Sequence, residues 1–213
     1  MGIAALNPSY VLPSHRNQRI SERRMPHHIR HSLSWNYHND AREFLHRYSM
    51  LRPENFSKSG RVKNFVDVLL AAECILKAHI FLGRSDTEPL ALYKEVRGFS
   101  HNIRRLAERA DYLDDRAPYD AVASRFESLS VNLRYSLDMW ETYFPAIDNA
   151  EQVAHYDRTV ASAAWRREAV DEVSYLTEQL SPALTGVVDC GLDELFNQEL
   201  EMAKFVQAAR VLR

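Results

Sequence analysis

The stretch from Arg61 to Phe81 constrains the fold more than any other part of the chain. Its apolar residues recur on almost every side of a helix rather than along one stripe. A helix that is apolar around most of its circumference has to be surrounded by other elements. Gly83 follows the stretch and predicts its end, because glycine is favoured just past a helix C-terminus. We therefore expect this segment to be the central helix of a bundle.

Amphipathic spacing predicts further helices around this segment, and no convincing strand. Pro53, Pro145 and Pro182 are expected to end three of them, because a proline disfavours helical geometry in the residue before it. Short connections between long helices favour antiparallel packing. The predicted fold class is all-α, an antiparallel up-down helical bundle. The expected helices cover residues 35–51, 90–96, 100–110, 119–144, 161–180 and 192–212, with a charged turn over 111–118 and a connector over 146–157.

Length and charge indicate one domain with an extension. A chain of 213 residues suits a single bundle, here 33–213, preceded by an irregular arm over 1–32. Residues 1–60 carry nine Lys and Arg against four Asp and Glu, a net charge of +5, whereas 61–213 carries a net charge of −7. One expectation for a basic arm of this kind is contact with nucleic acid or an acidic surface. The alternative is that it pairs with the acidic body of its own or a neighbouring chain.

Several classes of site are missing from the sequence. The two cysteines form no metal-binding pattern, and no phosphate loop or catalytic signature occurs, so we expect no metal and no cofactor. Glu43 and His46 form one ExxH pair, but a di-iron bundle needs a second. No apolar run approaches the ~18–20 residues that span a bilayer, and no secretory signal begins the chain. We expect no membrane insertion and a cytoplasmic protein.

Three short patterns carry the candidate chemistry. The first is Glu73 and Lys77, four residues apart inside the nearly all-apolar helix. The second is His101 between Ser100 and Asn102 at a predicted helix start, and the third is Arg134-Tyr135 within the predicted helix 119–144. A charged pair in an apolar helix has to be compensated or reach the edge of the core.

Taken in order, these patterns resemble the HEPN family (higher eukaryotes and prokaryotes nucleotide-binding). The family shows A-A-E-x-x-L-K-A, here residues 71–78, then (G/S)-H-(D/N)-(I/L)-x-x-L, here 100–106, and later R-Y, here 134–135. The resemblance covers roughly residues 61–145. It implies a bundle of four to five helices, often dimeric, that handles RNA or nucleotides, with toxin–antitoxin and defence-like members. Catalytic members are metal-independent ribonucleases whose Arg and His share one helix.

The chain departs from the nuclease pattern, because no histidine follows Arg134 on its predicted helix. We therefore expect an RNA- or nucleotide-binding module in which ribonuclease activity is absent or degenerate, with Arg134 and His101 facing one groove. The resemblance implies catalytic positions at His101, Arg134 and Tyr135, and ligand-binding positions at Glu73, Lys77, Arg104 and Arg105.

Structural roles compete with these. Glu73 and Lys77 could form only an intrahelical ion pair. Arg134 could pair with Glu73, Glu127 or Asp138, and Tyr135 could only pack. At the level of the whole chain, the alternative is a non-catalytic helical interaction protein that forms a homodimer through its last helix. A small-molecule enzyme with a pocket between helices is a third possibility.

Overall fold

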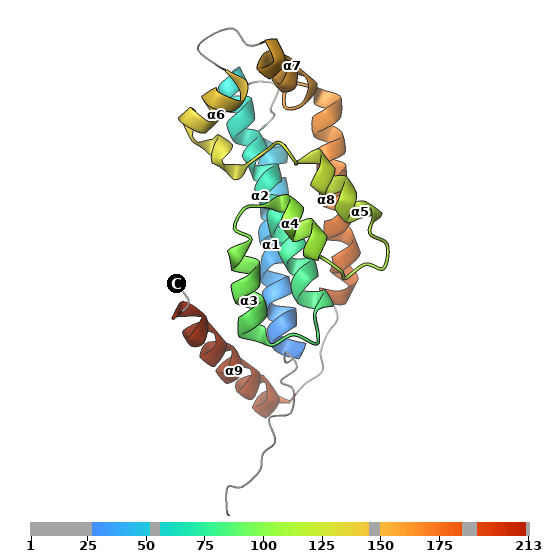
Figure 1. Ribbon diagram of the computed structural model, residues 1–213. Coiled ribbons are helices and arrows are strands. Elements are labelled where there is room, and N and C mark those ends of the chain that lie inside the picture. The colour runs from blue at the N-terminus through green and yellow to red at the C-terminus, as the bar shows by residue number, and fades with distance from the viewer. Residues whose placement is uncertain (1–26, 52–55, 145–149, 185–190, 212–213) are drawn as a thin grey trace, which may run out of the picture.

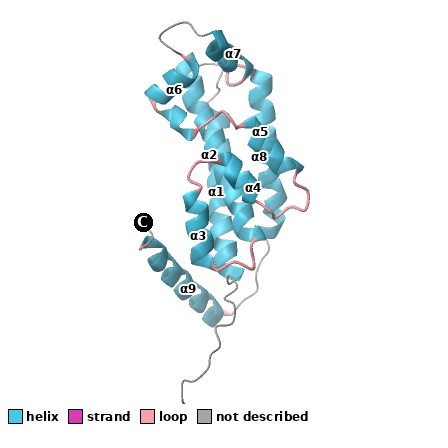
Figure 2. Cartoon of the chain, in the orientation of Figure 1, coloured by secondary structure: helices cyan, strands magenta, loops and turns pink. Residues whose placement is uncertain are grey.

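The computed structural model describes residues 27–51, 56–144, 150–184 and 191–211 (Figure 1). Within these ranges every regular element is helical and no strand occurs (Figure 2), so the predicted all-α fold class is confirmed. The elements are α1 (His27–Met50), α2 (Lys58–Gly83), α3 (Pro89–Gly98), α4 (Ile103–Arg109), α5 (Ala117–Arg125), the 3₁₀ helix η2 (Val131–Arg134), α6 (Ser136–Tyr143), α7 (Ala150–Arg158), α8 (Ala163–Leu184) and α9 (Leu192–Arg210).

Helix α2 is the centre of the bundle, as its sequence predicts. It runs antiparallel to α1, and α8 lies alongside the pair (Figure 1). Helix α4 and η2 also pack on α2, so neighbours surround it and its side chains are buried around its circumference. Burial of each large aliphatic or aromatic side chain contributes about 1.5–3 kcal/mol, which makes this helix the main source of stability.

Two histidines and one arginine join the long helices through polar contacts. His79 of α2 is fully buried; its Nε2 donates to the Leu176 carbonyl of α8 at 2.9 Å, and its Nδ1 lies 2.7 Å from the Tyr119 hydroxyl. His38 Nε2 of α1 donates to the Thr177 carbonyl, one residue further along α8. Arg47 of α1 binds the Asp67 carboxylate of α2 through two nitrogens. Arg47 therefore joins α1 to α2 through a two-point ion pair.

Three predicted boundaries differ from the structure. Residues 27–32, assigned to the irregular arm, form the first turns of α1, while 1–26 lie outside the described residues. Part of the expected connector 146–157 is helical, as α7. Helix α8 continues past Pro182 to Leu184, although Pro182 has no N–H to donate to the carbonyl of Glu178 one turn earlier.

The predicted helix over 119–144 is wrong, because three shorter elements replace it. After α5 the chain turns at Phe126, and Ser130 becomes extended, with its hydroxyl accepting from Asn132 N–H to cap η2. Serine side chains offer the backbone such local partners and so compete with helix. The expected apolar stripe also divides, because Leu133 is buried whereas Leu137 on α6 is 80% exposed.

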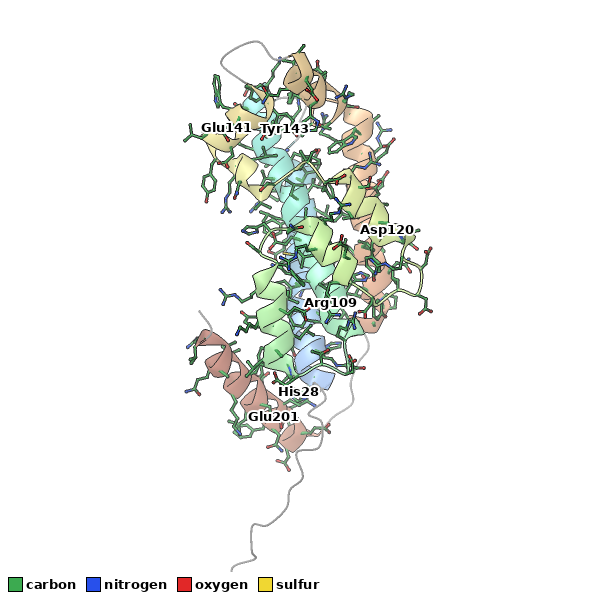
Figure 3. All side chains as sticks on the ribbon, viewed as in Figure 1. His28, Arg109, Asp120, Glu141, Tyr143 and Glu201 are labelled. Atoms are coloured by element: carbon green, nitrogen blue, oxygen red, sulfur yellow. The ribbon has the colours of Figure 1, made fainter. Side chains whose placement is uncertain are left out.

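Helix α9 packs on the rim of the bundle. Phe205 and Ala209 are buried against Ile29 of α1, with Tyr93 of α3 edge-on to Phe205. His28 Nε2 lies 3.1 Å from a carboxylate oxygen of Glu201, and Figure 3 labels this pair at the lower end of the molecule. Helix α9 therefore touches the body along one side, through a small cluster separate from the main core.

Candidate functional site

A buried carboxylate with a lysine and a histidine as partners forms the centre of the candidate site. Glu73 is only 5% exposed; its Oε1 lies 2.5 Å from Lys77 Nζ and its Oε2 lies 2.7 Å from His101 Nδ1. Removing a carboxylate from water is costly unless it is paired and hydrogen-bonded. Both oxygens of Glu73 have such a partner. The structure thus brings together residues from the first two sequence patterns.

Two elements position these three side chains. Helix α2 places Glu73 and Lys77 one turn apart on one face. The turn between α3 and α4 supplies His101, which follows Ser100 in the left-handed backbone region (φ 51°). Asn102 then caps α4 by accepting from the Arg105 N–H at 3.0 Å. The chain reverses abruptly at Ser100, which turns the imidazole back onto α2.

The environment of the pair controls what it can do. The side chain of His101 remains 43% exposed, so solvent and ligands reach the imidazole. Because Nδ1 donates to the Glu73 carboxylate, a neutral imidazole keeps its lone pair on Nε2, where it can accept a proton or a hydrogen bond. Lys77 Nζ lies 5.6 Å from the centre of the Tyr37 ring. Burial, with Tyr93, Cys74 and Glu73 adding to it, raises the pKa of Tyr37 to about 12.

Cys74 lies beside Glu73 in the sequence but is not a nucleophile. Burial first, and the nearby Glu73 carboxylate second, raise the pKa of its thiol to about 12. The reactive form of cysteine is the thiolate. Cys74 therefore stays protonated at neutral pH and serves as a core residue.

Exposed arginines precede and follow His101 in the sequence at the junction of α3 and α4. We call residues 97–105 the α3–α4 corner. Arg97 lies over the Tyr93 ring at 5.9 Å and Arg105 over the Phe99 ring at 4.8 Å, and within the described ranges neither forms an ion pair. Arg104 differs, because its guanidinium binds Glu127 and lies 3.5 Å from Glu108. Two of the corner's guanidinium groups thus remain available to an anion.

The third pattern lies on another surface element. Arg134 ends η2 instead of lying within a long helix; it is exposed, and its guanidinium lies 4.7 Å from the centre of the Tyr135 ring. Tyr135 is also exposed. Among the residues that the structure describes, Arg134 makes no hydrogen bond or ion pair, so the alternative ion pairs with Glu73, Glu127 and Asp138 are absent. Elements η2 and α4 both pack on α2.

Of the seven candidate residues, Lys77 and His101 both contact Glu73, and the other four lie outside this group. Arg105 lies at the same corner, Arg104 is held by carboxylates, and Arg134 and Tyr135 stack on each other. Sequence reasoning missed Arg97 and Tyr37. Arg97 falls outside the motif, although it lies four residues before His101; Tyr37 reaches the site only through the packing of α1 on α2.

Other candidate sites are weaker. A surface groove on α1 is lined by Asn39, Arg42, Glu43 and His46, which include the single ExxH pair. In the described part of the chain, no three His, Cys, Asp or Glu side chains gather closely enough to hold a metal ion. None of the helices described there is long and apolar enough to cross a membrane.

Comparison of the whole chain with protein-family models, curated proteins and solved structures finds no match.

Proposed function

We propose that the chain is a helical module that binds RNA or nucleotides at the α3–α4 corner, as the HEPN resemblance implies. The observation that carries the proposal is the contact of Glu73 with both Lys77 and His101, which joins two separate sequence patterns at a partly exposed point. A purely structural ion pair within α2 has no need of a third partner from another element. His101 is also close in sequence to Arg97 and Arg105, which have no carboxylate partner among the described residues.

The chemistry around His101 suits a phosphate-bearing ligand. Arg97 and Arg105 present guanidinium groups, which match the geometry of phosphate oxygens. The Glu73 carboxylate fixes the orientation of the imidazole, so His101 can donate from Nε2 to a phosphate oxygen when it is protonated. Arg134 and Tyr135 offer a cation and an aromatic face on a neighbouring element, and aromatic faces stack on bases in single-stranded nucleic acids.

Catalysis is not part of this proposal. General acid–base cleavage needs proton-transferring groups within reach of the same bond. Within the described residues no second histidine contacts His101, and the helix after Arg134 carries none. Incubation with labelled RNA in the presence of EDTA is expected to leave the RNA intact. Cleavage that depends on His101 would instead identify a metal-independent ribonuclease.

Fluorescence anisotropy with a labelled single-stranded RNA tests the binding. We expect affinity to fall steeply with salt, by about 0.7 logarithmic units per contacted phosphate for each tenfold rise in salt. Arg105→Ala is expected to weaken binding several-fold. It is also expected to reduce the slope of log affinity against log salt concentration by the amount that one phosphate contact contributes. Arg134→Ala is expected to weaken binding as well, by removing the cation beside Tyr135.

Arg167→Ala is the matched control, because Arg167 is an exposed arginine on α8, away from both elements. It is expected to leave affinity and salt slope unchanged. The proposal is contradicted if the wild-type chain binds neither RNA nor nucleotides at low salt. It is also contradicted if Arg105→Ala and Arg167→Ala weaken binding equally, because that result indicates diffuse attraction without a site.

A second candidate function, a non-catalytic interaction protein, is favoured by a different observation. Several large apolar side chains are exposed on α6 and α9, among them Leu137, Trp140, Leu192 and Phe196. Exposed apolar side chains that cluster mark interaction surfaces. The two functions are compatible, because these side chains lie on elements other than α3 and α4.

A further inference from the structure

We infer that the outer face of α9 binds the same face of a second copy, with the two helices antiparallel. This inference does not depend on the proposed RNA binding, because α9 contributes no residue to the α3–α4 corner. It rests on two properties of α9: an exposed apolar stripe and an uneven distribution of charge along the helix.

The stripe is large and lies apart from the contacts that hold α9 to the bundle. Phe205 and Ala209 face the body and are buried. By contrast, Leu192 is 85% exposed and Phe196 is 72% exposed. From Leu192 to Leu200 the exposed apolar residues recur at spacings of one, three and four residues, and Val206 follows six residues later. These spacings keep the exposed apolar residues on one side of the helix. They are Leu192, Leu195, Phe196, Leu200 and Val206.

Charge selects the partner and its direction. The first half of α9 carries Asp193, Glu194 and Glu199, whereas the second half carries Lys204 and Arg210. Glu201 lies between these two halves, and its carboxylate contacts His28 of α1 in the same chain. A helix that is acidic at one end and basic at the other is complementary to itself when two copies run antiparallel. Parallel pairing would place like charges together, which is destabilising.

The register follows from the positions of these charges. Pairing centred between Glu201 and Met202 places Asp193 opposite Arg210 of the second copy, and Glu199 opposite Lys204 of the second copy. A two-fold axis then repeats each contact, as an interface between identical faces requires. The same register sets Leu200 against Ala203 of the second copy, near the axis. With 19 residues, α9 gives a contact about 28 Å long.

Sedimentation velocity on the full chain tests the inference. The wild-type chain is expected to sediment as a dimer, and Phe196→Glu is expected to sediment as a monomer with an unchanged circular dichroism spectrum. Leu137→Glu is the matched control, because Leu137 is also a highly exposed apolar residue but lies on α6. It is expected to remain dimeric.

A charge exchange tests the antiparallel register. Arg210→Glu is expected to weaken the dimer several-fold, because it sets two acidic groups opposite each other. Adding Asp193→Arg to that variant is expected to restore the wild-type dimerisation constant.

A monomeric wild type at the highest soluble concentration overturns the inference, as does a Phe196→Glu dimer as tight as the wild type. Loss of the dimer in Leu137→Glu, or no rescue by the double exchange, overturns the proposed face or register. RNA binding by Phe196→Glu reports on the α3–α4 corner separately.

Discussion

Ser100 shows how one backbone angle supports the candidate site. It is the one non-glycine residue with a positive φ in the described part of the chain, at 51°. The left-handed region costs an L-residue about 1–2 kcal/mol. This strained residue lies in the turn that brings His101 into contact with Glu73. Strained backbone is common at functional sites, where the surrounding structure holds it in place.

Ser100→Gly is therefore expected to stabilise the fold by about 0.5–1 kcal/mol, because glycine tolerates this φ but loses more chain entropy on folding. Urea unfolding measures the change. Ser85→Gly is the matched control, since Ser85 is an exposed turn serine without a positive φ. It is expected to destabilise the fold instead. A destabilising Ser100→Gly would contradict the strain at this position.

The grouping of Glu73, Lys77 and His101 could be predicted at the residue scale because each lies in a short pattern. The position of Arg134 could not. Its neighbours Leu133 and Leu137 fit the spacing of one helix, but Leu133 is buried and Leu137 is exposed. Residue spacing does not show that the Ser130 hydroxyl caps the 3₁₀ helix η2, nor that the chain changes direction there before α6.

At the scale of elements, α2 could be predicted from sequence and the smaller helices around it could not. Apolar residues lie around most of the circumference of α2, so the helix has to be surrounded by other elements and lies at the centre of the bundle. The segments after α5 are short and depend on tertiary contacts, such as the ring contacts among Tyr143, Phe144 and Tyr156 that join α6 to α7. Local propensity gives little information about helices that packing stabilises.

The docking of α8 is expected to depend on pH through His79. Its Nε2 donates to the Leu176 carbonyl, and its Nδ1 accepts from the Tyr119 hydroxyl, so the buried ring is neutral. Burial lowers the pKa of His79 to about 4, below the usual 6.5. The unfolded chain thus binds the proton more readily, and stability is complete above about pH 6.5 and falls as the pH drops toward 4, by up to about 3 kcal/mol.

Hydrogen exchange of α8 amides across this pH range, corrected for intrinsic rates, measures the effect. His79→Gln keeps a donor and an acceptor without titrating there, and is expected to reduce the pH dependence. His38 of α1, which also contacts α8 and whose pKa burial lowers, keeps its own contribution. His46→Gln, a change at an exposed histidine of α1, is expected to leave it intact. Equal acid sensitivity in wild type and His79→Gln would exclude His79 as the titrating group.

At the scale of the whole molecule, the chain combines a rigid centre with two surfaces of different chemistry. The bundle core fixes α2, and α2 in turn supports both the α3–α4 corner and η2. Helix α9 lies at the rim of the bundle (Figure 1), and its exposed side chains include Leu192 and Phe196. In this arrangement a ligand at the corner and a second copy at α9 bind without competing for the same residues.

Photo-crosslinking of the full chain to a labelled single-stranded RNA, followed by mass spectrometry of the peptides, tests the central claim most directly. We expect crosslinks within residues 97–105 and at Tyr135, with loss of the first set in His101→Ala/Arg105→Ala. Crosslinks confined to α8 or α9, or a pattern that the double variant leaves unchanged, would contradict the assignment of the α3–α4 corner as the binding site.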